Sequence, residues 1–169
     1  SRFDVPPSEI RTLFEGSLLA GGRVLGGGEV WTDFRIQSDG VSRFVLRDCD
    51  LREQQSGRLV QRVLEIETYR MMALLALPHA QAAIPLLNSI ERELSQLTEG
   101  MLVMGNGADG SSERAILDRL TALAARTEAL SLNSNYRFTA AAAYYGVVKA
   151  RIHELREERL EGTPTLGEF

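Results

Sequence analysis

One acidic residue, Glu67, falls where the sequence pattern predicts a buried helix face. At about 100° per residue along a helix expected over 51–77, Glu67 lies near the centre of the apolar arc, with Arg70 at its edge. Burial of an unpaired carboxylate is costly, so Glu67 must be either paired or protonated. Arg70, three residues on, is the simplest partner, and Tyr145 or Lys149 of a later helix is a second candidate.

This candidate buried polar pair, Glu67 and Arg70, permits two interpretations. A general base or a polar switch in the core would need a shifted pKa, and perturbed carboxylates do gather at functional sites. A structural ion pair that fixes helix packing is the commoner use of such residues, and we favour it.

A second group of charged side chains belongs to a predicted β-hairpin. Residues 29–37 and 41–48 flank Ser38-Asp39-Gly40, which suits a three-residue loop with Gly40 in the left-handed conformation. A slip of one residue would exchange the two faces, and only this register leaves one face apolar. The predicted cross-strand pairs are Ile36 with Ser42, Phe34 with Phe44, and Thr32 with Leu46.

The opposite face of this hairpin is our candidate partner or anion surface. Trp31 is expected across from Arg47, close enough for a cation–π contact. Arg35 would oppose Arg43, a like-charge pair that is destabilising unless an anion or an acid lies between them. The alternative is a solvated sheet face with a small salt network, which is the commoner arrangement. The surface comprises Trp31, Asp33, Arg35, Arg43 and Arg47, with Val45 among them.

No spacing typical of catalysis or of metal or nucleotide binding stands out. The histidines, His79 and His153, lie in different predicted helices without the HxxxH or HExxH spacing of zinc enzymes. Cys49 is the single cysteine and cannot form an internal disulfide. Gly26-Gly27-Gly28 lacks the following Lys-Ser/Thr and the helix start of a phosphate loop. We therefore predict no catalytic residue, no cofactor and no metal site, and we favour a non-enzymatic protein.

The composition is that of an ordinary globular domain. The 169 residues are 44% hydrophobic and 25% charged, enough to bury a core without disulfides or metals. The net charge of −4 disfavours nucleic-acid binding, which is typical of a basic surface. We see no signal peptide and expect no stretch near the ~20 apolar residues that span a bilayer. The abrupt ends suggest one soluble domain, 1–169, cut from a longer chain.

These side chains must be positioned by an α+β fold, in which a small antiparallel sheet precedes four mostly antiparallel α-helices. Residues 1–49 should hold a short helix opened by Pro6-Pro7, a strand over 18–20 and the hairpin. Residues 50–162 should be helical. The helices are expected over 51–77, over 80–103, from Ser111 or Ser112 onward, and from a cap at Asn133-Ser134-Asn135 to about 161.

The second of these helices should bury a single apolar stripe. Its large apolar residues recur every three or four positions, which is typical of a helix with one packed face. The stripe comprises Leu87, Ile90, Leu94, Leu97 and Met101.

Several segments together resemble a known bacterial family. The most specific is Gly57 to Leu77 (GRLVQRVLEIETYRMMALLAL), supported by Val30 to Gly40 (VWTDFRIQSDG). With these segments, the chain from about residue 16 to 169 is similar to domain-of-unknown-function family 3422, described as predicted membrane-anchored proteins. Further supporting segments are Ser42 to Phe44, Tyr136-Arg137-Phe138, Arg151 to Arg156 (RIHELR) and Thr165 to Phe169.

This resemblance implies that the chain is the soluble middle piece of a longer protein. Members of the family have further sequence before this region and a helical tail that ends in predicted membrane spans. The expected partners are then the missing parts of the same chain, the membrane is reached only through an absent C-terminal region, and this domain is cytoplasmic. The family has no assigned activity that could be carried over to a residue here.

Three functions follow, in order of preference. The first is an interaction or assembly module, with a homo-oligomer formed through the helices. The second rests on layout alone and is the sensing or gating part of a CorA-like divalent-cation transport protein. The third is an enzyme that uses Glu67 and the hairpin arginines. The second would bind cations between subunits through Glu154, Glu157, Glu158 and Glu161.

Overall fold

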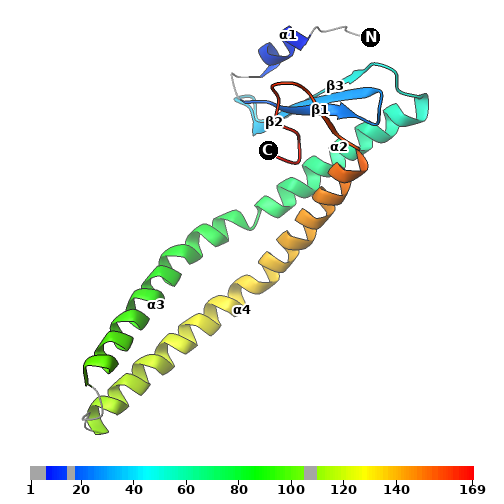
Figure 1. Cartoon of the computed structure of the whole chain (residues 1–169). Coiled ribbons are helices and arrows are strands. Elements are labelled where there is room, and N and C mark those ends of the chain that lie inside the picture. Colours follow the sequence, from blue (N-terminus) through cyan, green and yellow to red (C-terminus); the bar gives the residue numbers. More distant parts are fainter. Residues whose placement is uncertain (1–6, 15–17, 105–109) are drawn as a thin grey trace. The chain divides into compact units, whose positions relative to one another are not determined.

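The computed structural model describes residues 7–14, 18–104 and 110–169. These residues belong to two compact units. The sheet unit comprises residues 1–71 and 144–169, and the helical unit comprises residues 72–143. The chain is α+β, as expected (Figure 1).

The sheet unit is built on four antiparallel strands in the order β3-β2-β1-β4 (Figure 1). Helix α1 and the single-turn η1 precede them, and α2 follows β3. The elements are α1 (Pro7–Ile10), η1 (Arg11–Leu13), β1 (Ala20–Val24), β2 (Gly28–Ile36), β3 (Ser42–Asp48), α2 (Glu53–Leu74) and β4 (Glu158–Arg159).

Each face of the sheet has its own apolar cluster. On the inner face, Val24 and Val30 pack with Val63 and Ile66 of α2 and with Leu155 near the chain's C-terminal end. On the outer face, Trp31 packs with three residues of the N-terminal segment and of the approach to β1: Ile10, Phe14 and Leu19. Large aliphatic side chains buried in this way each stabilise the fold by about 1.5–3 kcal/mol. Both faces of the small sheet are therefore partly covered.

The hairpin of β2 and β3 has the predicted turn but only part of the predicted register. Gly40 has a φ of 80°, and Ile36 pairs with Ser42, as expected. The predicted pairs Phe34–Phe44 and Thr32–Leu46 are wrong, because the ladder is interrupted between Thr32 and Ile36. Beyond this bulge, Thr32 pairs with Phe44 and Val30 pairs with Leu46.

The bulge is held by local side-chain bonds. Phe34 has a φ of 50°, a left-handed conformation that is uncommon for a bulky residue. The Thr32 hydroxyl accepts from the Phe34 N–H at 3.0 Å, and Asp33 Oδ1 accepts from the Arg35 N–H at 3.0 Å. The Gln37 amide donates to Asp33 Oδ2 at 2.5 Å. The first two bonds satisfy backbone N–H groups at the point where the ladder is interrupted, and the third fixes the Asp33 side chain.

The helical part differs from the expected four helices. After β3 the chain forms α2, α3 (Leu77–Met104) and α4 (Gly110–Glu154). Only Leu75 and Ala76 separate α2 from α3. The predicted cap at 133–135 does not interrupt α4, so the expected third and fourth helices are one. Helix propagation adds a hydrogen bond for each residue fixed, and this outweighs the few tenths of a kcal/mol that Asn and Ser cost there.

The end of the chain is also not helical as expected. The last helix was predicted to reach about residue 161, but α4 ends at Glu154, and Arg156 has a φ of 49°. The Leu155 carbonyl accepts from the Leu25 N–H at 2.8 Å, and Glu158–Arg159 then pairs with Gly22 and Arg23 as strand β4. The C-terminal segment thereby closes an edge of β1.

One helical stretch in the described residues is long and apolar enough to qualify as a candidate membrane span, which we expected of no segment. Within Glu53–Leu102, a window is long and apolar enough to cross a membrane by length and composition alone, and little of it is buried. Residues 72–90 contain no Asp, Glu, Lys or Arg. The expectation that no stretch approaches such a length is therefore wrong by this measure.

Candidate functional site

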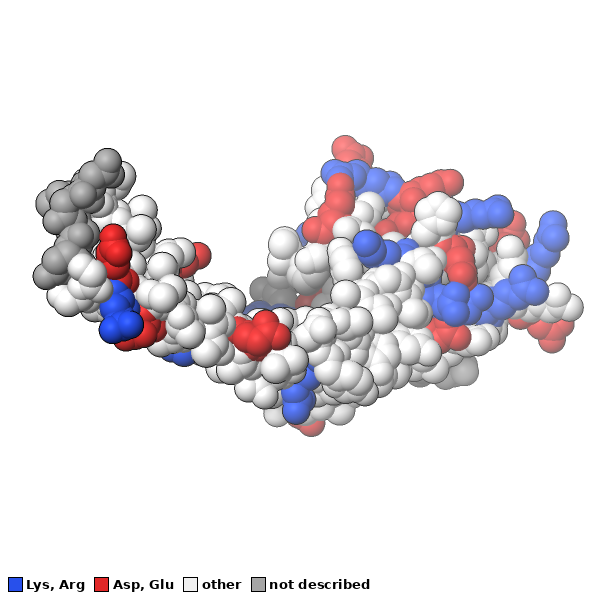
Figure 2. Space-filling model, turned by 90° about the horizontal axis from the view of Figure 1, so that it is seen from below, with Lys and Arg blue, Asp and Glu red and all other residues white. Residues whose placement is uncertain are grey.

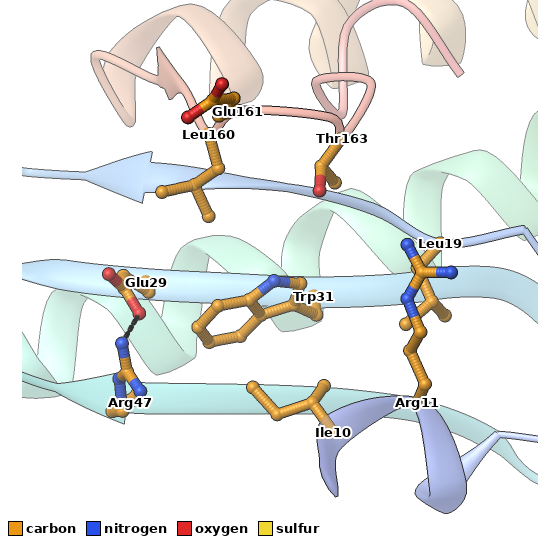
Figure 3. A pocket seen from close by; sticks show the side chains of 9 residues that line it. All are labelled: Ile10, Arg11, Leu19, Glu29, Trp31, Arg47, Leu160, Glu161 and Thr163. Carbon is orange, nitrogen blue, oxygen red and sulfur yellow. Dashed lines mark ion pairs between the residues drawn. The ribbon is translucent and has the colours of Figure 1, made fainter. Parts of the chain in front are cut away.

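The outer face of the sheet carries a pocket of about 400 Å³ (Figure 3). Trp31 lies in the middle of the pocket, with Arg11 toward one end and the Glu29–Arg47 ion pair toward the other. The walls come from α1, η1, the residue before β1, strands β2 and β3, and the segment after β4. The lining residues are Ile10, Arg11, Leu19, Glu29, Trp31, Arg47, Leu160, Glu161 and Thr163.

The ion pair of Glu29 and Arg47 results from the corrected strand register. The two residues are directly opposite each other in the β2–β3 ladder, and Glu29 is only 5% exposed. Arg47 also lies over the Trp31 ring, with Cζ 5.4 Å from the ring centroid, so the expected cation–π contact is present. Trp31 itself pairs with Val45 rather than with Arg47, and the contact is diagonal.

Neighbouring groups stabilise the charged form of Arg47. Burial acts to lower the pKa of Arg47, but contacts with Cys49 and with the Glu29 carboxylate outweigh it and raise that pKa above its ordinary value. Glu29 lies outside the surface predicted from the sequence. The signal was available, because Glu29 and Trp31 are two residues apart and so share a face of β2.

The other residues of the predicted surface do not line this pocket. Asp33 is buried in the bulge, where it bonds to Arg35 and Gln37. Arg43 forms an ion pair with Asp39 of the turn. The bulge also removes the predicted like-charge opposition, because the ladder is interrupted between Thr32 and Ile36 and does not pair Arg35 with Arg43. Of the five candidate residues, Trp31 and Arg47 come together here.

Glu67 and Arg70 form a bidentate ion pair on α2. Arg70 Nε lies 2.8 Å from Glu67 Oε2, and Arg70 Nη2 lies 3.0 Å from Oε1. Both side chains are partly buried. Arg70 Cζ lies 5.0 Å from the centroid of the Phe34 ring, which also contacts Phe44 edge-on. The guanidinium is thus held between a carboxylate and an aromatic ring, an arrangement suited to positioning the bulge on α2.

The four glutamates considered as cation ligands have separate roles. Glu154 pairs with Arg62 and Arg151. Glu157 accepts from the Leu166 N–H at 2.7 Å, and burial raises the pKa of this carboxyl above its ordinary range. Glu158 lies in β4, and Glu161 lines the outer-face pocket. Within the described ranges, no group of three or more His, Cys, Asp or Glu side chains could hold a metal ion.

The helical unit presents a second candidate surface, on α3. The expected single stripe is in fact divided between two faces. Leu97 is 5% exposed, whereas Leu87, Leu94 and Met101 are each more than 40% exposed. The buried side continues to Arg126 of α4, whose guanidinium reaches across to α3.

The exposed side of α3 has a heptad pattern of its own. Its residues are spaced alternately by three and four positions, the spacing of a coiled-coil seam. On the face shown in Figure 2, charged side chains crowd the sheet unit and are sparse over much of the helical unit. We call the exposed α3 residues with this heptad spacing the outer seam; they are Ile84, Leu87, Glu91, Leu94, Thr98 and Met101.

Comparison with known proteins identifies a family. Searches of the curated proteins and of the solved structures found no match. One family model matches residues 3–169, nearly the whole chain. The chain therefore belongs to the family described as Protein of unknown function (DUF3422).

Proposed function

We propose that this chain is an assembly module that associates with a second copy of itself through the outer seam of α3. The observation that carries the proposal is the exposure of Leu87, Leu94 and Met101 at seven-residue spacing. Contiguous apolar surface on a protein marks interaction sites, and heptad spacing selects another helix as the partner. A copy of the same chain supplies a helix with the matching spacing.

The alternative occupant of this seam is a lipid surface. The stretch 72–90, which lacks charged residues, includes Ile84 and Leu87 of the seam and ends directly before Glu91. Glu91 lies within the seam, and Arg92, Glu93 and Glu99 follow on the same helix. Carrying all of these charges into a bilayer costs several kcal/mol, whereas a helix–helix interface takes up only Glu91 and leaves Arg92, Glu93 and Glu99 outside the seam. Self-association is therefore the better account of the seam.

Sedimentation of the 169-residue chain tests this proposal. Wild type should form a dimer or a higher oligomer at micromolar concentration, and Leu87→Ser with Leu94→Ser should sediment as a folded monomer. Leu117→Ser with Leu132→Ser is the matched control, because both leucines are exposed on α4 and lie outside the seam. The control should associate as wild type does.

Two outcomes would overturn self-association. A wild-type chain that is monomeric at all concentrations excludes it. Cosedimentation of the monomer with anionic phospholipid vesicles, lost in the Leu87→Ser and Leu94→Ser variant, would assign the seam to a lipid surface instead. We propose separately, on the family resemblance alone, that the protein is attached to a membrane.

A second candidate function is binding of an apolar carboxylate in the outer-face pocket. Within the described part of the chain Arg11 has no ionic partner, and it stands at one end of a pocket floored by an indole. Trp31 is the single tryptophan, so its fluorescence reports on this site directly. Titration with phenylacetate should change the fluorescence, and benzyl alcohol or the Arg11→Gln variant should weaken the effect at least tenfold. Equal responses to both compounds would exclude an anion site.

A further inference from the structure

We propose that the two outer seams pair antiparallel, about a two-fold axis that passes between residues 92 and 93 of α3. This inference rests on the proposed self-association and specifies its geometry. The outer seam itself determines the register. In antiparallel coiled coils, a residue at one heptad position packs beside a residue at the other position, so the numbers of paired residues have a constant sum.

One register pairs every seam residue. If Ile84 lies beside Met101 of the second copy, then Leu87 lies beside Thr98 and Glu91 lies beside Leu94, and the two-fold axis repeats the three pairs. A shift by one heptad in either direction leaves two of the six seam residues of each copy without a seam partner. The six seam residues are therefore self-complementary only in this alignment, as a two-fold interface requires.

The charges at the centre favour the same orientation. A parallel, in-register pair would place Glu91 against Glu91 of the second copy, a like-charge contact inside the seam. In the antiparallel register, Glu91 instead lies beside Leu94 and on the same flank as Arg92 of the second copy. Two residues of helical rise, about 3 Å along the axis, separate these charges.

Arg92 is available for such a contact. Its Nε donates to the Asn88 carbonyl at 3.1 Å, and the described residues offer it no acidic partner. A groove on this side of α3 is lined by Asn88, Glu91, Arg92, Ser95, Gln96 and Glu99. In the proposed dimer, positively and negatively charged side chains of the second copy would therefore lie beside this polar groove. The apolar residues would lie on the other side of the seam.

Cysteine cross-linking distinguishes the two orientations. In a Cys49→Ser background, the antiparallel arrangement predicts that Leu94→Cys cross-links to itself under mild oxidation. Ile84→Cys and Met101→Cys should each fail alone, because 17 residues of rise separate the two copies of either site by about 25 Å. A mixture of these two variants should cross-link efficiently. A parallel pair predicts the reverse, with self-linking at both sites and no mixed product.

Charge exchange provides an independent test of the centre. Glu91→Arg and Arg92→Glu should each raise the dimer dissociation constant at least tenfold, because each places like charges together. A mixture of the two variants should form heterodimers at close to wild-type affinity, since every Arg then faces a Glu. Unchanged affinity in the single variants, or no recovery on mixing, would contradict the proposed centre.

The results separate this inference from the proposed function. If Leu87→Ser with Leu94→Ser dissociates the oligomer while cross-links follow the parallel pattern, self-association stands and the antiparallel register is wrong. If wild type is monomeric, both fail. Antiparallel cross-links together with rescue on mixing support both.

Discussion

Arg126 of α4 holds Glu93 of α3 with a forked contact. Its Nη1 lies 2.8 Å from Oε1 and 3.0 Å from Oε2 of Glu93, and its Nη2 donates to the Ser89 hydroxyl at 2.8 Å. One guanidinium therefore joins two turns of α3 to α4. Because two of its nitrogens bond to two different residues of α3, the planar guanidinium is oriented more strongly than by a single ion contact.

Replacing this arginine should loosen the helical unit modestly. Both side chains of the ion pair are more than a third exposed, so Arg126→Gln should lower the free energy of unfolding by about 0.5–1 kcal/mol. Urea denaturation followed by far-UV circular dichroism measures the loss, which should shrink at high salt. Arg119→Gln is the control, because the described residues give Arg119 no ionic partner. An equal loss in both variants would mean that the fork adds nothing.

The buried ion pair on the outer sheet face should be far more sensitive. Glu29→Ala leaves the Arg47 guanidinium partly buried and without its carboxylate, so we expect a loss of about 2–4 kcal/mol. Glu29→Gln keeps a hydrogen-bond acceptor and should cost less. Unfolding followed by Trp31 fluorescence reports on this face. A loss below about 0.5 kcal/mol for the alanine variant would show that Arg47 finds another partner.

Glu157 should give stability an unusual dependence on pH. Burial raises the pKa of this carboxyl, so the folded state binds its proton more tightly than the unfolded chain does. Its contribution is thus fully present below the ordinary value of 4.5 and is lost as pH rises through the folded-state pKa. Glu65 and Glu168 act in the opposite sense, because hydrogen bonds from Gln61 and from the Thr165 backbone lower their pKa values.

Substitution isolates the Glu157 contribution. Glu157→Gln keeps an oxygen for the Leu166 N–H but removes the titration, so its stability should fall less than that of wild type between pH 4.5 and 7. At pH 7 it should be the more stable protein. Urea midpoints at several pH values measure both effects, with the exposed Glu158→Gln as the control for a lost charge. Parallel curves for wild type and Glu157→Gln would refute the assignment.

Two glycines should respond to alanine with opposite signs. At Gly21 in β1, a Cβ would lie 2.6 Å from the Val30 carbonyl oxygen and 2.5 Å from the Trp31 ring, so Gly21→Ala should destabilise by about 2 kcal/mol. At Gly57 in α2, a Cβ would meet nothing within 4 Å, and alanine is the better helix former. Gly57→Ala should stabilise by about 0.5–1 kcal/mol. Thermal unfolding of both variants provides the comparison, and a shared sign would contradict it.

Local features of this protein could be predicted from the sequence. The turn at Gly40, the Ile36–Ser42 pair beside it and the bond between Glu67 and Arg70 each depend on residues a few positions apart. For such features, side-chain chemistry and spacing determine the geometry, because few alternative partners are within reach. The α+β class also follows from the change between two-residue and heptad periodicity.

The tertiary structure decided whatever depends on distant partners. The bulge at Phe34 forms where its ring packs with Phe44 and Arg70 while Asp33 turns inward. Sequence rules for hairpins consider the two strands and their turn, and they do not include contacts with a helix such as α2. Strand β4 exists because β1 offers a free edge to residues more than a hundred positions away. Within one periodic run of α3, Leu97 is buried and Leu94 is exposed, because α4 covers only one side. A sequence reveals which residues are apolar, but only the packed neighbours decide which of them remain open to a partner.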